Sequence, residues 1–379
     1  MATLPKKTVN VPFADLSYPT GAVKKTYIAA VKKFLDGGNF ILSKEVEEFE
    51  KKWAKYCGAD FALGLSSGGD AIYVALKILD VGKGDEVITQ GNAYNATVTA
   101  IMRTGAKPRF ADIDPETLTI NPEKILPLIN EKTKVILPVH LYGLVADMER
   151  ISKIAEQNKL FIVEDCAQAH GAKREGKKAG IWSEIAAWSF YPTKNLGAFG
   201  EAGAITTKSE KYFQRGVALR NLGQEGKNNH KYFGFNMRLD GLEAIALSLK
   251  LPFLNDWTEK RIEAAEFYDE LIDEVFDGEV AAPPKISSAK HIYHLYAITL
   301  KKGLDRNLIQ KNLSKQAVQT AVHYPVPVYK QPFFAEKTDK CPITEDLCSR
   351  ILSLPIFFGI TRKQQKYVVE SLRNSIPII

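Results

Sequence analysis

Seven short apolar runs recur between residues 61 and 206, and amphipathic segments separate most of them. The runs cover residues 61–65, 85–89, 108–111, 134–138, 160–163, 186–189 and 204–206, and the clearest helical patterns cover 71–79, 96–104 and 148–158. Strands that alternate with helices are typical of a parallel sheet with helices on both faces. The alternation therefore predicts an α/β fold with a mostly parallel seven-stranded sheet.

The organisation of the chain changes after Leu239. A largely helical stretch covers 242–272 and is interrupted near Pro252, because proline cannot continue a helix without losing a hydrogen bond. Beyond it we expect a strand at 294–300, a helix at 306–315, a proline-rich loop at 323–327 and a closing helix at 361–374. The chain is therefore predicted to form a large domain with an N-terminal arm, residues 1–250, and a smaller α+β domain, residues 251–379.

Composition narrows the function less than the motifs do. The 51 basic and 44 acidic residues leave a formal charge of +7, and no long basic run marks a nucleic-acid track. The excess favours a small anionic substrate such as a nucleotide diphosphate. No stretch reaches the roughly 18 apolar residues of a membrane helix, so we expect a soluble, cytoplasmic protein.

The cysteines follow no metal-binding or disulfide pattern, and no paired histidine spacing suggests a metal ligand set. We expect reduced, mostly buried thiols and no metal site. The four residues are Cys57, Cys166, Cys341 and Cys348.

One lysine and one aspartate carry the strongest chemical signal. Lys194 lies in a turn with Pro and Gly, in the segment SFYPTKNLG (189–197), and Asp165 ends the apolar run at 160–163. Pyridoxal phosphate (PLP) needs an amine that holds its aldehyde as a Schiff base and a carboxylate that keeps its ring nitrogen protonated. Each residue alone has a commoner explanation, a solvated charge or a helix cap. Their combination at the carboxyl end of a buried strand favours PLP chemistry.

Three segments occur together in a familiar order: EDCAQAHG (164–171), SFYPTKNLG (189–197) and GFNMRL (234–239). With them the chain resembles the PLP-dependent nucleotide-sugar aminotransferases of the DegT/DnrJ/EryC1/StrS family over nearly its whole length. The resemblance implies a PLP-dependent transferase of fold type I, similar to aspartate aminotransferase.

The same resemblance implies a role for each motif residue. Lys194 forms the Schiff base, Asp165 meets the pyridine nitrogen, and Gln168 contacts the hydroxyl side of the ring. Ser189 binds the phosphate from its own subunit, and Asn236 reaches the phosphate of the neighbouring subunit. The implied unit is a homodimer with shared active sites, although Asn236 could instead cap the following helix.

The segment SSGGD (66–70) lies between an expected strand and helix, so its backbone N–H groups could hold a phosphate. Gly68 and Gly69 let the backbone approach the anion. Many family members carry a threonine where this chain has Gly69, so only main-chain donation is available there. A plain turn with an N-cap would explain the same residues.

Other site candidates are less specific. Tyr94 follows an expected strand and is placed to lay its ring on the cofactor. His323 and Tyr324 resemble the substrate-side loop of the family, and Arg220 is a further candidate for substrate contact. His170 is expected to be a scaffold residue beside the site.

The predicted activity is transfer of an amino group from an amino acid, L-glutamate by resemblance, to the keto group of a nucleotide-linked deoxy sugar. Residues 190–192 and 195–197 resemble the C3 branch of the family, whereas the C4 branch tends to carry histidine in both places. The product would serve amino-sugar biosynthesis for lipopolysaccharide, O-antigen or glycosides. The alternatives are a C4 aminotransferase, a sugar 3-dehydratase, an amino-acid transaminase and a non-catalytic regulator; Lys194 argues against the dehydratase, whose relatives have histidine there.

Overall fold

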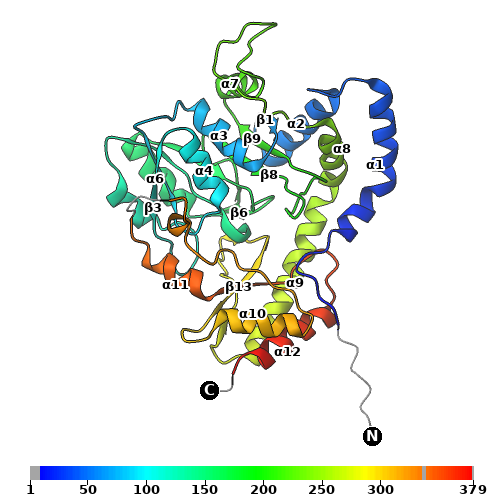
Figure 1. Ribbon diagram of the computed structural model, residues 1–379, viewed down its shortest axis with the longest axis vertical. Helices are drawn as coiled ribbons and strands as arrows, with labels where there is room; N and C mark the ends of the chain where they lie inside the picture. Colours follow the sequence, from blue (N-terminus) through cyan, green and yellow to red (C-terminus); the bar gives the residue numbers. More distant parts are fainter. Residues whose placement is uncertain (1–8, 335–338, 378–379) are drawn as a thin grey trace.

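The computed structural model describes residues 9–334 and 339–377 (Figure 1). Its largest element is a seven-stranded sheet of order β1-β9-β8-β5-β4-β2-β3, which confirms the predicted fold class. Only β9 runs antiparallel to its neighbours; the other adjacent pairs are parallel. The strands are β1 (Phe61–Leu65), β2 (Glu86–Gln90), β3 (Lys107–Ala111), β4 (Thr133–Ile136), β5 (Phe161–Asp165), β8 (Ile185–Ser189) and β9 (Gly203–Thr207).

Both faces of this sheet are buried, because alternate side chains of a strand point to opposite faces. Ile162 of β5 joins one apolar cluster and Val163 joins the other. The first cluster includes side chains of α2 (Lys44–Cys57), α6 (Met148–Asn158) and α8 (Gly241–Lys250). The second includes side chains of α3 (Gly68–Ile78), α4 (Asn95–Arg103) and α7 (Glu210–Arg220).

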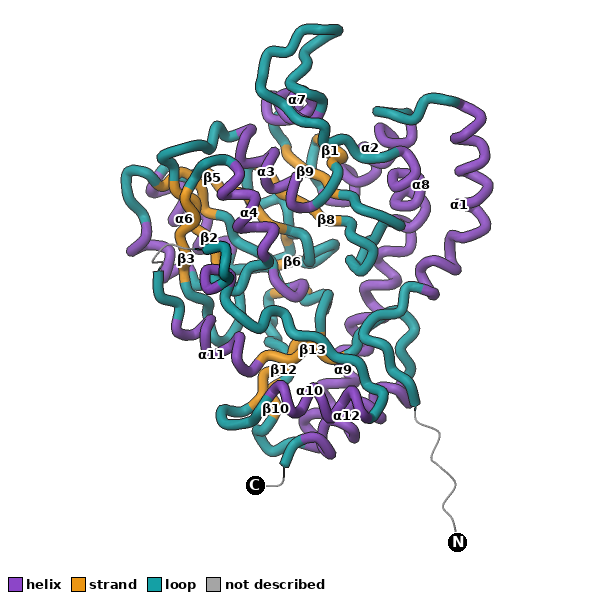
Figure 2. The backbone as a smooth tube through the Cα atoms, in the orientation of Figure 1, coloured by secondary structure: helices purple, strands orange, loops and turns teal. Residues whose placement is uncertain are grey.

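The long helical stretch after Leu239 breaks where proline predicted it. α8 ends at Lys250, a 3-10 turn covers Leu251–Phe253, and α9 (Leu254–Val275) continues. Figure 2 shows α9 running from beside α8 to the smaller lower part of the molecule. The sequence analysis did not identify α1 (Ser17–Gly37) or α2, which precede the sheet.

The smaller part is an antiparallel sheet of order β10-β12-β13 covered by helices. Its elements are β10 (Val280–Ala281), β12 (Tyr296–Leu300), β13 (Ile351–Leu354), α10 (Arg306–Lys315), α11 (Pro342–Arg350) and α12 (Arg362–Ser375). Val11 of the arm pairs with Val318 and lies in this core, although it precedes the whole large sheet in sequence. The domain boundary at residue 250 stays a prediction.

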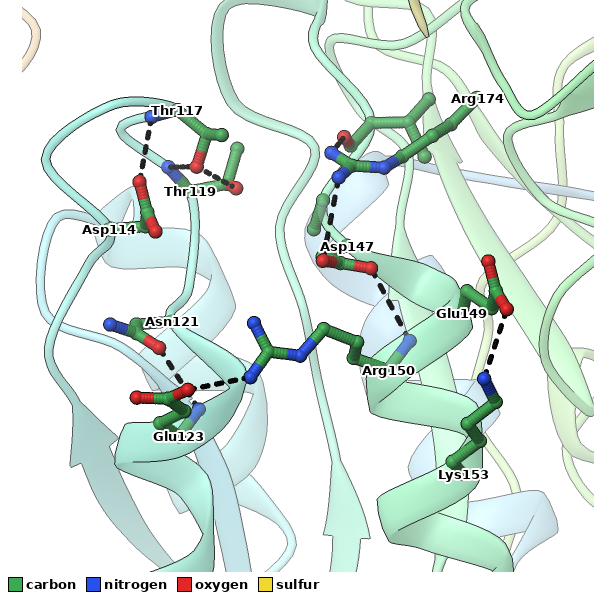
Figure 3. Close-up of polar contacts among 12 residues, drawn as sticks. Asp114, Thr117, Thr119, Asn121, Glu123, Asp147, Glu149, Arg150, Lys153 and Arg174 are labelled. Carbon is green, nitrogen blue, oxygen red and sulfur yellow. Dashed lines mark hydrogen bonds and ion pairs between the residues drawn. The ribbon is translucent and has the colours of Figure 1, made fainter. Parts of the chain in front are cut away.

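Two short elements complete the fold: α5 (Pro122–Ile125) and a sheet of β6 (Lys173–Arg174), β7 (Lys177–Lys178) and β11 (Ala289–Lys290). Arg150 of α6 reaches Glu123 of α5 at 2.8 Å, and Asp147 caps α6 and contacts Arg174 at 3.5 Å (Figure 3). Exposed pairs such as Arg150–Glu123 contribute little to stability.

The four cysteines are buried and unpaired, as expected. Within residues 9–334 and 339–377, no helix is long and apolar enough to span a membrane.

Glu50 and Arg220 form a buried ion pair that joins α2 to the end of α7. Both residues are less than one-tenth exposed, and Glu50 Oε1 also accepts the Gly64 N–H at 2.6 Å. Removal of one partner leaves the other charge buried and uncompensated. We therefore expect Glu50→Ala to lower the free energy of unfolding by about 3–5 kcal/mol in urea denaturation.

The control is Glu149→Ala, which removes the exposed pair between Glu149 and Lys153 on α6 (Figure 3). Its unfolding midpoint should match the wild type. Equal midpoints for the two variants would show that the buried pair contributes no more to the free energy of unfolding than the exposed pair does.

Candidate active site

A cavity of about 860 Å³ opens at the carboxyl ends of the parallel strands. Its wall combines segments of the large sheet, the smaller domain and the arm, including Phe13 and Asp15. Ligands of open α/β sheets bind at this edge. The predicted residues that line it are Gly68, Gly69, Tyr94, Asp165, Gln168, Ser189, Lys194, His323 and Tyr324.

Asp165 is the last residue of β5 and is only 3% exposed. Its Oδ2 accepts the Thr97 hydroxyl at 2.8 Å, and its Oδ1 accepts the Ala167 N–H at 3.0 Å. Burial raises the pKa of this carboxyl, while the two hydrogen bonds oppose that rise. Asp165 therefore ends a strand rather than capping a helix.

A buried hydrogen-bonded pair that the sequence analysis missed fixes the strand end behind Asp165. His140 Nε2 lies 2.8 Å from Glu164 Oε2, and the His140 N–H donates to the Asp165 carbonyl at 3.0 Å. The Glu164 carboxylate also accepts the N–H groups of Gly180 and Trp182. Both groups are engaged by protein hydrogen bonds, so the pair acts as scaffold. The apolar run that ends in two adjacent acids was the sequence signal for it.

Lys194 lies in the expected turn, with its N–H donating to the Tyr191 carbonyl at 2.8 Å. The surrounding protein lowers the pKa of its amine to about 8, and the nearby Asp165 carboxylate limits that fall. Only glycine fits at position 197 in this turn, because a Cβ there would lie 2.2 Å from the Pro192 carbonyl oxygen. Lys250 Nζ donates to the Gly197 carbonyl at 2.7 Å and holds the loop in place.

Backbone N–H groups and one hydroxyl form a cradle beside the lysine. Gly68 and Gly69 are the first residues of α3, so their N–H groups have no helical partners. A Cβ on Gly68 would lie 2.6 Å from Ser189 Cβ, so the two segments are in direct contact. The hydroxyls of Ser66 and Ser67 donate to Asp70. The donors left for an anion are therefore the two glycine N–H groups and the Ser189 hydroxyl.

Aromatic and amide side chains form the opposite wall. Tyr94 stacks on Tyr324, with ring centroids 5.3 Å apart. Gln168 Oε1 accepts the Tyr142 N–H at 2.7 Å. His323 stacks on Phe13 of the arm, and burial lowers the pKa of His323 to about 4, so it is neutral at physiological pH.

The structure gives no support for substrate contact by Arg220. Its guanidinium does not line the cavity and is buried against Glu50 and the Gly64 carbonyl. The sequence showed the charge but not the partner, which lies far away in the chain. We therefore correct this prediction and assign Arg220 to the scaffold.

Two further predicted residues lie outside the cavity of their own chain. Asn236 is exposed and forms a bridge with Asn221, while the N-cap of α8 is Asp240, so Asn236 does not cap that helix. His170 is fully buried and packs among the rings of Trp53 and Phe190, as a scaffold residue does.

His294 is a cavity residue that the sequence analysis did not identify. Its Nδ1 lies 2.9 Å from Asn195 Oδ1, next to Lys194 in the chain. The sequence analysis assigned residue 294 to a strand, and nothing in that pattern indicated that its side chain lies in the cavity wall.

The arrangement of these residues fits PLP. Lys194 would bond its aldehyde, Asp165 would face its ring nitrogen, and the cradle at Gly68, Gly69 and Ser189 would hold its phosphate. A seven-stranded α/β sheet with this site defines a PLP-dependent transferase of fold type I.

Comparison with known proteins identifies the family. The model of the DegT/DnrJ/EryC1/StrS aminotransferase family matches residues 22–373, so the chain belongs to this family and is a PLP-dependent aminotransferase. A "Pleiotropic regulatory protein" of Geobacillus stearothermophilus is 40% identical over 96% of this chain and 98% of its own. The dTDP-3-amino-3,6-dideoxy-alpha-D-galactopyranose transaminase of Aneurinibacillus thermoaerophilus is 40% identical over 96% and 99%.

A solved structure supports the same assignment. S. venezuelae DesV in complex with a ketimine intermediate superimposes with a TM-score of 0.92 at 35% identity, covering 97% of this chain and 98% of DesV.

The lowered pKa of Lys194 predicts how the protein captures its cofactor. Only the neutral amine attacks an aldehyde, so the rate of covalent PLP capture by the apo-protein should rise roughly tenfold per pH unit and level off above about pH 8. In Asp165→Asn the charge that stabilises the ammonium is gone, so the inflection should move to lower pH. Stopped-flow absorbance measures both profiles.

Asp256→Asn is the control, since Asp256 is exposed on α9. Its profile should match the wild type. An inflection near the ordinary lysine pKa, or one that lies at the same pH in Asp165→Asn as in the wild type, would contradict the electrostatic coupling.

Proposed function

We propose that the enzyme transfers an amino group from an amino acid, L-glutamate, to the C3 keto group of a nucleotide-linked deoxy sugar. The observation that carries this proposal is the single cavity in which Lys194 and Asp165 lie together with the loop that contains His323 and Tyr324. Its volume of about 860 Å³ suits a cofactor with a sugar substrate. The name of the transaminase of Aneurinibacillus thermoaerophilus supports the substrate class.

The chain supplies proton transfer, orientation and exclusion of water. PLP, when bound, acts as the electron sink for the reacting carbon. Lys194 is the group that would move a proton at that carbon, and a pKa of about 8 keeps part of its amine neutral at physiological pH. Thr97 and Ala167 hold the Asp165 carboxylate at the cavity, where it would keep the ring nitrogen of bound PLP protonated.

The neighbours of Lys194 and the 3-amino sugar in the name of the Aneurinibacillus thermoaerophilus transaminase both favour C3. Amination at C4 is the alternative within the family. A regulatory role is the second candidate function, and one observation favours it: a relative 40% identical to this chain is called a regulatory protein. We infer a cytoplasmic enzyme of lipopolysaccharide, O-antigen or glycoside biosynthesis.

The purified enzyme, loaded with pyridoxamine phosphate, should convert a 3-keto sugar linked to dTDP, UDP or GDP, and mass spectrometry should detect the amino sugar. Matched 4-keto sugars and 2-oxoglutarate are the comparison substrates. Turnover of 4-keto sugars alone would establish the C4 alternative. Turnover of 2-oxo acids alone would establish an amino-acid transaminase, and no turnover of any of them would favour the regulator.

We also infer that two subunits share each active site. The loop around residues 221–236 projects from the molecule beyond α7 (Figure 1), and it carries the exposed Asn236 and Phe233, which is 86% exposed. Tyr94 and Tyr191, on the cavity wall, are about half exposed in the single chain. Large exposed apolar side chains at a site rim are typical of an interface. An isologous dimer would cover them and bring Asn236 to the phosphate of its neighbour.

Mixing Lys194→Ala with Asn236→Asp subunits tests the shared site. Each variant alone should be inactive, because one lacks the amine and the other places a negative charge at the phosphate. In an equal mixture half of the dimers are mixed and have one intact site, so about a quarter of wild-type activity should return. The control is the mixture before subunit exchange. Absence of recovery after proven exchange, or a fully active monomer, would exclude the shared site.

A further inference from the structure

Three arginines of the described residues are more than nine-tenths buried: Arg220, Arg261 and Arg306. Arg220 has Glu50 as its counter-ion. The Arg306 Nε donates to Asn307 Oδ1 at 2.8 Å, and its Nη1 donates to two carbonyls. Arg261 differs from both, because no carboxylate of residues 9–334 and 339–377 lies within ion-pair distance of it and its buried Nε has no hydrogen-bond partner. A buried charge without a counter-ion is costly.

The Arg261 guanidinium is held rigidly by one of its nitrogens. Nη1 donates to the carbonyls of Ile356 at 2.8 Å, Tyr293 at 3.3 Å and His294 at 3.4 Å, and Cζ lies 4.7 Å from the centre of the Phe358 ring. Neither Nε nor Nη2 makes a hydrogen bond to the described residues, and Nε is buried, so Nη2 is the nitrogen left for a ligand. Burial lowers the pKa of Arg261 to about 10, so the group stays charged at physiological pH.

Arg261 lines the same cavity as Lys194. The connection between them is short: Arg261 bonds the His294 carbonyl, and the His294 ring contacts Asn195, the residue after Lys194. Lys250 also lines the cavity, but its ammonium already donates to a carbonyl and lies 3.9 Å above the Phe199 ring. Apart from Lys194 itself, Arg261 is therefore the cation of this wall that has an unused nitrogen among the described residues.

We propose that Arg261 binds the α-carboxylate of the amino-acid donor, and of the 2-oxo acid formed from it, through Nη2. The inference rests on the proposed function, which requires such a donor, and adds the residue that recognises it. A guanidinium nitrogen forms a charge-assisted hydrogen bond with a carboxylate oxygen, and this bond is stronger than one between neutral groups. The ligand also supplies the counter-ion that the protein lacks at this position.

The position favours a carboxylate over the diphosphate of the nucleotide sugar. The α-carboxylate is bonded directly to the carbon that reacts, so its partner must lie near Lys194. The diphosphate is separated from C3 by atoms of the sugar ring, so it lies farther from the reacting carbon.

The test measures binding of 2-oxoglutarate, which has the carboxylates but no amine, to the PLP-loaded enzyme by calorimetry, with dTDP as the second ligand. Arg261→Met should weaken 2-oxoglutarate binding roughly 10- to 100-fold and leave dTDP binding within about twofold, since a charge-assisted hydrogen bond is lost only for the first ligand. In the half-reaction of the PLP form with L-glutamate alone, followed by stopped-flow absorbance, the half-saturating L-glutamate concentration should rise by a similar factor with a smaller change in the limiting rate.

Arg306→Met is the matched control, because Arg306 is an equally buried arginine that bonds carbonyls outside the cavity. It should leave both ligands unaffected. If Arg261→Met does not fold, Arg261→Lys is measured instead, because it keeps the charge but removes the planar guanidinium and its Nη2. Weaker 2-oxoglutarate binding then supports the proposal, and unchanged binding overturns it.

Three results overturn the inference: wild-type enzyme that does not bind 2-oxoglutarate, unchanged 2-oxoglutarate binding in Arg261→Met, or weakened dTDP binding with intact 2-oxoglutarate binding. The last would assign Arg261 to the diphosphate. Since these measurements use no keto sugar, they are independent of the sugar panel, and either proposal can fail while the other stands.

Discussion

The site depends on keeping the Asp165 carboxylate ionised at the edge of a buried sheet. Burial works against the charged form, and the structure opposes it with the Thr97 hydroxyl, the Ala167 N–H and the nearby amine of Lys194. The buried His140–Glu164 pair fixes the backbone of the same strand end. A PLP enzyme needs this negative charge at one defined place, so much of the surrounding hydrogen bonding serves its position.

The sequence predicted the large sheet to within one or two residues per strand, because buried parallel strands form apolar runs bounded by turn residues. Lys194 and Asp165 were recognisable for a related reason, since their chemical context is contiguous in the chain. Arg220 was misassigned and Arg261 overlooked because a buried charge is interpreted through its partners, and these lie far away in sequence. The short strands β10 and β13 of the small sheet left too little periodicity to detect.

The net charge of the chain says less about where an anion binds than the position of each charged side chain does. The cavity wall contains three acidic and three basic side chains, Asp15, Asp165 and Glu201 against Lys194, Lys250 and Arg261, so the excess of +7 is not concentrated there. Affinity for an anion therefore depends on which cations lack a protein partner. Lys250 donates a hydrogen bond to the loop of Lys194, whereas Nη2 of Arg261 makes no hydrogen bond to the described residues.

The N-terminal arm has a consequence for how the protein is made. Val11 exchanges backbone hydrogen bonds with the segment around Val318, and Phe13 next to it donates its N–H to Gln319 Oε1 at 3.2 Å. These contacts join residues more than 300 positions apart, and closing so long a loop is slow compared with local folding. During synthesis on the ribosome the arm cannot dock until the segment around Val318 has emerged, which requires most of the chain to be made. The large sheet can form earlier, so a nascent chain would pass through a stage in which Lys194 and Asp165 are in place but the cavity still lacks the walls that the smaller domain and the arm supply.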